Sequence, residues 1–215
     1  MTAIFPIIGV FTLGALLCYG EQRNDARAKW VFKPVTSALF LLAALSGAPD
    51  GAYDWALFVG LALCLLGDVL LISHDAGWFV AGLAAFLLGH VCYVVAFNGL
   101  VIVTSLNSLI LSLIVLVSAG IFLWLRPHLG PMRNPVIAYI VVITLMLCSA
   151  WAVFFVTDMG VTFRVLVAVG ATAFYISDIT VARDRFMGAG FINRAVGLPL
   201  YYLGQFMLAF SVGAC

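Results

Sequence analysis

Residues 52–71 read AYDWALFVGLALCLLGDVLL, and only Asp54 and Asp68 among these positions are charged. A helix that crosses the hydrocarbon layer of a bilayer needs about 20 mostly apolar residues. The whole chain has the same character, since 65% of its 215 residues are hydrophobic and 9% are charged, whereas a soluble domain is about half apolar and about a quarter charged. The fold class that follows is all-α, a polytopic transmembrane helix bundle.

The rest of the chain divides into similar apolar segments joined by brief connections that contain glycine and proline. We expect about eight spans, near residues 3–20, 34–48, 53–73, 77–97, 107–125, 135–156, 161–182 and 197–213. Seven spans are the alternative, because the second segment is short. No connection is long enough for a soluble domain, so residues 1–215 are expected to form one transmembrane domain. The first segment lacks a basic leader region, so we expect it to be retained.

A weak internal repetition suggests two four-helix halves. Lys33-Pro34 opens the second span as Asn134-Pro135 opens the sixth, and an aspartate ends both the third span and the seventh. A stripe of small residues on the third span, Gly60, Cys64 and Gly67, favours close approach of a neighbouring helix. The five cysteines are interpreted as small core residues, because they are odd in number and form no CxxC pair.

Charge placement predicts the orientation and limits the partners. The chain has 10 Lys+Arg and 9 Asp+Glu, with a formal net charge of +1, so it has no basic field for nucleic acid. Arg164 alone among the basic residues lies on the side opposite the others. Because cytoplasmic loops are enriched in Lys and Arg, the odd-numbered connections are predicted to face the cytoplasm. In a bacterium this would be a multi-pass protein of the cytoplasmic membrane, with membrane lipid as its surroundings.

Two acidic residues lie inside spans, and both are predicted to lie near the cytoplasmic surface. Asp68 is about 8 Å and Asp178 about 6 Å from the expected cytoplasmic ends of their spans, at about 1.5 Å per residue. An acidic side chain at mid-membrane costs roughly 2.5–3.5 kcal/mol on insertion scales, so such residues usually face the bundle interior and are functional. The two aspartates are therefore the candidate catalytic residues.

Polar residues of other spans are expected at the same level as the aspartates. Lys33, Thr36 and Ser37 open the second span, and Tyr139 lies near the start of the sixth. His90 is predicted about 20 Å from the cytoplasmic end of its span, below the aspartates. The candidate substrate-binding or positioning residues are Lys33, His90, Tyr93, Tyr139, Ser177, Tyr201, Tyr202 and Gln205.

Structural interpretations compete with these functional ones. Either aspartate can be an anchor that is hydrogen-bonded or paired with Lys33, His90 can be a satisfied core residue, and one of Tyr201 and Tyr202 can belong to the interfacial aromatic belt. A metal site is disfavoured because two carboxylates and one histidine specify it weakly, so neither a metal nor an organic cofactor is expected. Motifs such as GxSxG, HExxH and GxxxxGK[ST] are absent from the sequence.

Two acids held in a partly dry cavity tend to differ in proton affinity, which pairs a general acid with an anionic stabiliser. This pairing suits the cleavage of an acid-labile ether or acetal-like bond, as in glycoside hydrolysis. The expected depth of the aspartates corresponds to the glycerol and first chain carbons of a lipid. A small proton-coupled transporter with the same aspartates as a relay is the main alternative, and a lipid-binding scaffold is another.

Several short motifs resemble the YhhN-like lysoplasmalogenase family of polytopic membrane proteins, over about residues 30–210. The motifs are Lys33-Pro34, Gly67-Asp68-Val69-Leu70-Leu71, Phe79 to Gly82, Phe86, Gly89-His90 with Tyr93, Ser177-Asp178 with Ala182 and Phe186, and Tyr201-Tyr202-x-x-Gln205. The resemblance implies hydrolysis of the vinyl ether bond of lysoplasmalogens, which are alkenyl lysophospholipids, to a fatty aldehyde and a glycerophospho-base. It implies catalytic roles for Asp68 and Asp178.

Overall fold

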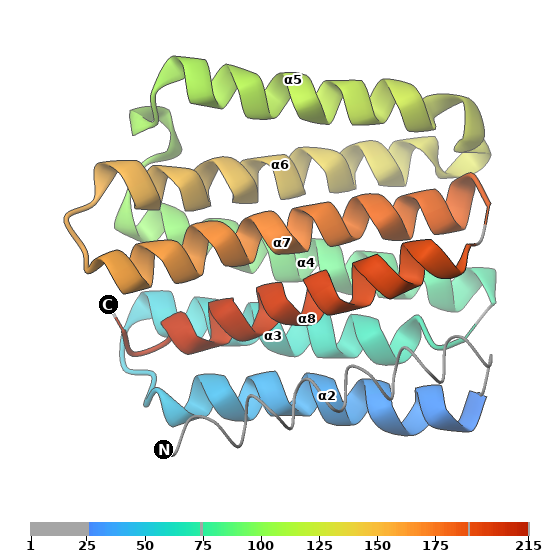
Figure 1. Ribbon diagram of the computed structural model, residues 1–215, viewed down its shortest axis with the longest axis horizontal. Helices are drawn as coiled ribbons and strands as arrows, with labels where there is room; N and C mark the ends of the chain where they lie inside the picture. Colours follow the sequence, from blue (N-terminus) through green and yellow to red (C-terminus); the bar gives the residue numbers. More distant parts are fainter. Residues whose placement is uncertain (1–25, 74, 189, 215) are drawn as a thin grey trace.

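The computed structural model describes residues 26–73, 75–188 and 190–214, and these residues form helices and connections without any strand. The α-helices are α2 (Ala26–Ser46), α3 (Ala52–Leu70), α4 (Ala76–Leu100), α5 (Ser108–Leu125), α6 (Arg133–Val156), α7 (Val161–Phe186) and α8 (Phe191–Ser211). Short 3-10 helices cover Val103–Ser105, Arg126–His128 and Gly130–Met132. The α-helices run side by side along one direction, with α2 and α5 at opposite edges of the bundle in Figure 1.

The helix lengths confirm a multi-pass membrane protein. Among the described residues, six helices, α2 to α7, are long and apolar enough to cross a bilayer. Helix α8 packs along α7 over its length (Figure 1). The span expected at residues 3–20 lies outside the described residues, so the total of eight spans and the division into two halves stay predictions.

Several predicted helix boundaries are wrong by one or two turns. Helix α2 begins at Ala26 rather than at residue 34, so Pro34 lies inside it, and α8 begins at Phe191 rather than at residue 197 with Pro199 inside. The expectation for the second span treated Pro34 as a helix start, where its missing N–H costs nothing. Membrane helices tolerate internal proline because neighbouring groups satisfy the freed carbonyl. Helix α7 also continues to Phe186 rather than ending at residue 182.

Glycines bring two helix pairs into close contact. A Cβ added to Gly60 of α3 would lie 2.9 Å from the Gly89 carbonyl oxygen of α4 and would collide with the Tyr93 ring. A Cβ on Gly204 of α8 would lie 2.7 Å from the Gly170 carbonyl oxygen of α7. The small-residue stripe predicted on α3 is thus confirmed as a helix contact, and these contacts hold rigid the pairs that carry the two aspartates.

Substitution of Gly60 by alanine is expected to destabilise the bundle by about 1–3 kcal/mol, because the new methyl group overpacks the interface with α4. Gly120 of α5 provides the control, since a Cβ there meets nothing within 4 Å. Gly120→Ala is expected to leave stability unchanged or to raise it slightly, because alanine has the higher helix propensity. Thermal unfolding in detergent tests both, and equal effects of the two substitutions would contradict this packing.

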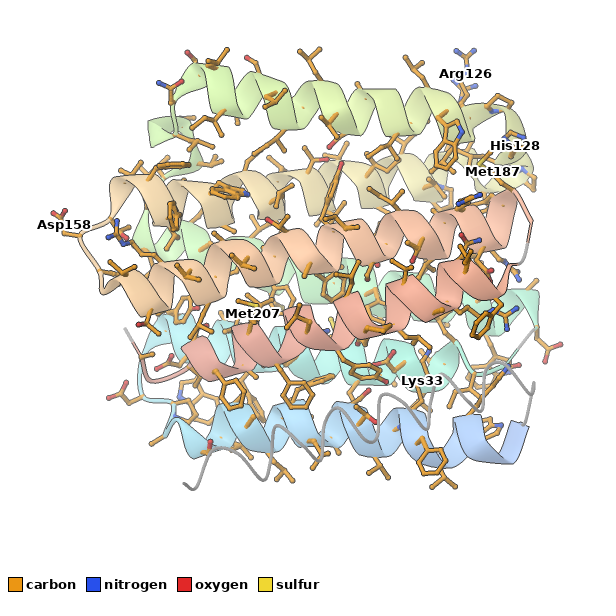
Figure 2. All side chains as sticks on the ribbon, viewed as in Figure 1. Lys33, Arg126, His128, Asp158, Met187 and Met207 are labelled. Atoms are coloured by element: carbon orange, nitrogen blue, oxygen red, sulfur yellow. The ribbon has the colours of Figure 1, made fainter. Side chains whose placement is uncertain are left out.

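Basic residues gather at one end of the bundle. The first turns of α2 and α8 and the last turn of α7 carry lysine or arginine, whereas Arg164 lies at the start of α7, at the other end. In Figure 2, Lys33, Arg126 and His128 lie toward the same end, opposite Asp158. This asymmetry agrees with the predicted orientation, in which the basic end faces the cytoplasm.

Candidate active site

A cavity of about 920 Å³ lies inside the basic end of the bundle and takes wall residues from all seven described α-helices. Its lining includes Ser73, Arg185 and Gly188, which lie at helix ends or in connections there. Asp68 and Asp178 both line this cavity. Two acidic side chains from distant parts of the sequence therefore share one space.

The Asp68 carboxyl group is surrounded by hydrogen-bond donors and a cation. Its Oδ2 atom accepts a hydrogen bond from Ser37 Oγ at 2.6 Å and another from the Tyr201 hydroxyl at 2.6 Å. Lys33 Nζ lies 3.5 Å from Oδ1, and only 2% of the Asp68 side chain is exposed. Hydroxyl donors and an ammonium group stabilise the ionised form of a carboxyl group. The surroundings of Asp68 are thus those of a carboxylate.

A chain of hydrogen bonds supports Asp68 from behind the cavity wall. Gln205 Nε2 donates to the Tyr201 hydroxyl at 3.2 Å, and the Tyr93 hydroxyl donates to Gln205 Oε1 at 2.8 Å. Tyr93 and Gln205 are both fully buried. Tyr202 lies beside this chain, with its hydroxyl 3.5 Å from Ser37 Oγ. These hydrogen bonds fix the direction of the Tyr201 hydroxyl, because the Gln205 amide that donates to it is itself held by the Tyr93 hydroxyl.

Asp178 has different neighbours, one of which is an unpaired imidazole nitrogen. The Tyr139 hydroxyl donates to Asp178 Oδ2 at 2.5 Å. His90 Nδ1 lies 2.6 Å from the Phe86 carbonyl oxygen, which can only accept, so Nδ1 carries the hydrogen. His90 Nε2 is buried without a hydrogen-bond partner and lies 3.9 Å from Asp178 Oδ2. A protonated carboxyl group suits this setting, because a neutral imidazole presents a lone pair to it.

The position of His90 corrects the sequence analysis, which placed it below the level of the aspartates. The imidazole lies at the level of Asp178 and against the ring of Phe174, with 4.6 Å between ring centroids. The physical reason is the length of α7, which continues to Phe186. Asp178 therefore lies about two turns from the end of its helix rather than one, and this depth brings it to His90.

The candidate residues divide into two groups. Those that line the cavity are Lys33, Asp68, Tyr139, Ser177, Asp178 and Tyr201. His90, Tyr93, Tyr202 and Gln205 do not line it, and they contact residues that do, directly or through one intermediate. Ser37 was not predicted as a direct partner of Asp68. Its spacing of four residues from Lys33 was an available signal, because i and i+4 side chains share a helix face.

Ligands for a metal ion are sparse in this cavity. Among the described residues, no group of three or more His, Cys, Asp or Glu side chains is close enough to hold one. Cys64, which contacts the Tyr93 hydroxyl, is a free thiol, as are Cys92 and Cys148. Cys18 and Cys215 lie outside the described residues. The arrangement offers acid–base chemistry by the side chains themselves: the Asp68 carboxyl group among hydrogen-bond donors and a cation, and the Asp178 carboxyl group beside the His90 imidazole.

The fold and the cavity define a class: polytopic α-helical membrane proteins with two carboxyl groups inside the bundle. Comparison with known families shows which family of this class the chain belongs to. The YhhN family model matches residues 28–212, so the chain belongs to the YhhN family. No solved structure matches the chain.

Several relatives carry an enzyme name. A protein of Mycobacterium bovis named lysoplasmalogenase is 33% identical over 188 residues, which cover 85% of this chain and 68% of that protein. Lysoplasmalogenase TMEM86A of Bos taurus is 33% identical over 157 residues, or 72% of this chain and 64% of that protein. The uncharacterized membrane protein YhhN of Escherichia coli is 26% identical over 211 residues, which cover 97% of this chain and 99% of that protein.

Proposed function

We propose that this chain is a lysoplasmalogenase, which hydrolyses the vinyl ether bond of an alkenyl lysophospholipid. The products are a fatty aldehyde and glycerophosphoethanolamine or glycerophosphocholine. The observation that carries the proposal is the pair of carboxyl groups on one cavity, with a cation and two hydroxyl donors around Asp68 and the His90 imidazole beside Asp178. The names of the relatives support the substrate class.

The different surroundings of the two aspartates support different roles. Asp178, which forms no ion pair with a lysine or arginine of the described residues, is the general acid. Its proton goes to the β-carbon of the alkenyl chain, and the electron pair of the double bond forms the new C–H bond. The α-carbon becomes an oxocarbenium ion, which the Asp68 carboxylate stabilises.

Water completes the reaction. It adds to the oxocarbenium carbon and gives a hemiacetal, with one proton of the water returning to Asp178. The hemiacetal then collapses to the aldehyde and the free glycerol hydroxyl, so water is the one co-reactant consumed. Tyr201 and Tyr139 hold the two carboxyl groups in position through their hydroxyls. The remaining positioning residues of the site are Lys33, His90, Tyr93, Ser177, Tyr202 and Gln205. The ammonium group of Lys33 also binds the phosphate group of the substrate.

The decisive test uses the purified protein in lipid nanodiscs with a lysoplasmalogen and with its saturated alkyl-ether counterpart. Aldehyde is expected from the first substrate only, because the alkyl ether has no alkenyl carbon to protonate. Absence of aldehyde from the lysoplasmalogen would refute the proposal. The transporter alternative gains no support from the relatives, whose names are those of lysoplasmalogenases or of an uncharacterized membrane protein.

Hydrolysis in D₂O tests the position of proton transfer. The aldehyde is expected to carry one deuterium on the carbon next to its carbonyl group, because that carbon is the former alkenyl β-carbon. Mass spectrometry measures the label, and preformed aldehyde incubated with the protein in D₂O corrects for exchange. Unlabelled aldehyde would show that the ether bond is cleaved without carbon protonation.

A further inference from the structure

A second, smaller space lies beside the cavity, between α5 and α6. It is a groove of about 380 Å³ at the membrane-facing edge of the bundle. Its lining residues are Val115, Ser118, Ala119, Phe122, Ile137, Ile140, Val141, Thr144 and Leu145. All but Ser118 and Thr144 are apolar, so the groove suits a hydrocarbon chain.

The wall between the groove and the cavity is one layer of side chains. Tyr175 of α7 lines the cavity, and its hydroxyl lies 2.7 Å from Oγ of Ser118, which lines the groove. Thr144 Oγ1 donates to Ser118 Oγ at 2.8 Å. Ile140 lines both spaces. A rotation of Tyr175 would join the two spaces and leave Ser118 bonded to Thr144.

The wall lies next to the reacting groups and slightly deeper in the membrane. Tyr175 precedes Asp178 by three residues on α7, which is about 4.5 Å along the helix. Beyond this level, the bundle interior is closed by fully buried side chains, among them Tyr93, Phe97 and Met146. A molecule whose head lies at the mouth and whose reacting bond lies between the aspartates has its next atoms at this wall. A long chain cannot continue straight down the bundle axis.

From this arrangement we infer that the groove between α5 and α6 binds the aliphatic chain of the lysolipid substrate, which leaves the cavity past Ile140 and Tyr175. The inference rests on the proposed function and adds a chain-binding site to it. The groove and the cavity share Ile140 as a lining residue, and the contact between Tyr175 and Ser118 is what separates them. Ser118 also has a structural role, since it and Leu125 are the two buried residues of α5, and the test must separate that role from chain binding.

Photo-cross-linking tests the inference without requiring turnover. The ligand is an alkyl-ether lysophospholipid, which lacks the alkenyl group, with a diazirine at the end of its chain. Labelling is expected on Val115, Ala119 and Val141 and should decrease with an excess of unlabelled ligand. Labelling confined to cavity residues such as Phe79 or Ile72 would overturn the inference. Labelling of the groove that the excess does not reduce would also overturn it, since the groove would then hold membrane lipid only.

Substitutions on α5 provide the second test. Ala119→Trp fills the groove at an exposed position, and Leu116→Trp is the matched control on the same helix, because Leu116 is 68% exposed and does not line the groove. Ala119→Trp is expected to lower kcat/KM for long-chain lysoplasmalogens by about tenfold or more and to leave a short-chain analogue unaffected. Leu116→Trp should change neither. Equal loss for both chain lengths, or no loss for either, would overturn the chain site and leave the proposed hydrolysis intact, whereas absence of aldehyde from the unmodified protein would refute the hydrolysis itself.

Discussion

Asp178→Asn is expected to lower kcat for aldehyde release by about 100- to 10,000-fold, the usual contribution of a general acid. Asparagine has nearly the same shape, and its amide oxygen accepts the Tyr139 hydroxyl as the Asp178 carboxyl oxygen does. The substitution removes the acidic proton while the packing around His90 is kept. The expected loss is therefore in kcat, with little change in stability or in substrate binding.

Asp158→Asn is the matched control for this substitution, because Asp158 is exposed in the connection between α6 and α7, at the far end of the bundle (Figure 2). The activity of the Asp158→Asn variant should equal that of the unmodified protein. Binding of the alkyl-ether ligand to the Asp178→Asn variant should also be unchanged, since the lost proton acts in the transition state. Full turnover in Asp178→Asn would remove Asp178 from the mechanism and leave the reaction to be explained by other groups.

The meeting of Asp68 and Asp178 in one cavity was predictable from the sequence, because each lies a few residues from the same end of its span. Depth along a span follows from the span limits and the rise per residue, so an error of one turn still leaves both aspartates near the same end. The interaction of Asp178 with His90 was not predictable in the same way. It depends on where α7 ends, and the boundary expected at residue 182 was four residues short of Phe186.

Partners that are set by rotation around a helix axis were not predicted either. Ser37 was placed at the right level, but its bond to Asp68 depends on which face α2 turns toward α3. The expected start of α2 at Pro34 left Lys33 outside the helix. In the structure α2 begins at Ala26, so Lys33 and Ser37 both lie inside it and share one face. The groove between α5 and α6 depends on side-chain packing alone and has no signature in the apolar sequence of either helix.

Asp68→Asn is expected to lower kcat by about 100- to 1,000-fold, because it removes the fixed negative charge that stabilises the oxocarbenium ion. It should also destabilise the fold, since Lys33 Nζ then faces a neutral amide 3.5 Å away instead of a carboxylate. Loss of one partner of a buried ion pair costs about 3–5 kcal/mol. We expect about 1–3 kcal/mol here, because the Lys33 side chain keeps 14% exposure to the cavity and part of its charge remains solvated.

The double variant Lys33→Met with Asp68→Asn separates catalysis from structure. Methionine removes the unpaired ammonium group and fills a similar volume, so stability should return to near that of the unmodified protein. The hydroxyls of Ser37 and Tyr201 can still donate to the asparagine oxygen, so the site keeps its shape. If Asp68 is catalytic, aldehyde release stays as low as in the single variant, although the melting temperature recovers. If Asp68 is only an anchor for Lys33, activity returns with stability to the level of the Lys33→Met single variant, and the assignment of the oxocarbenium-stabilising charge to Asp68 is then wrong.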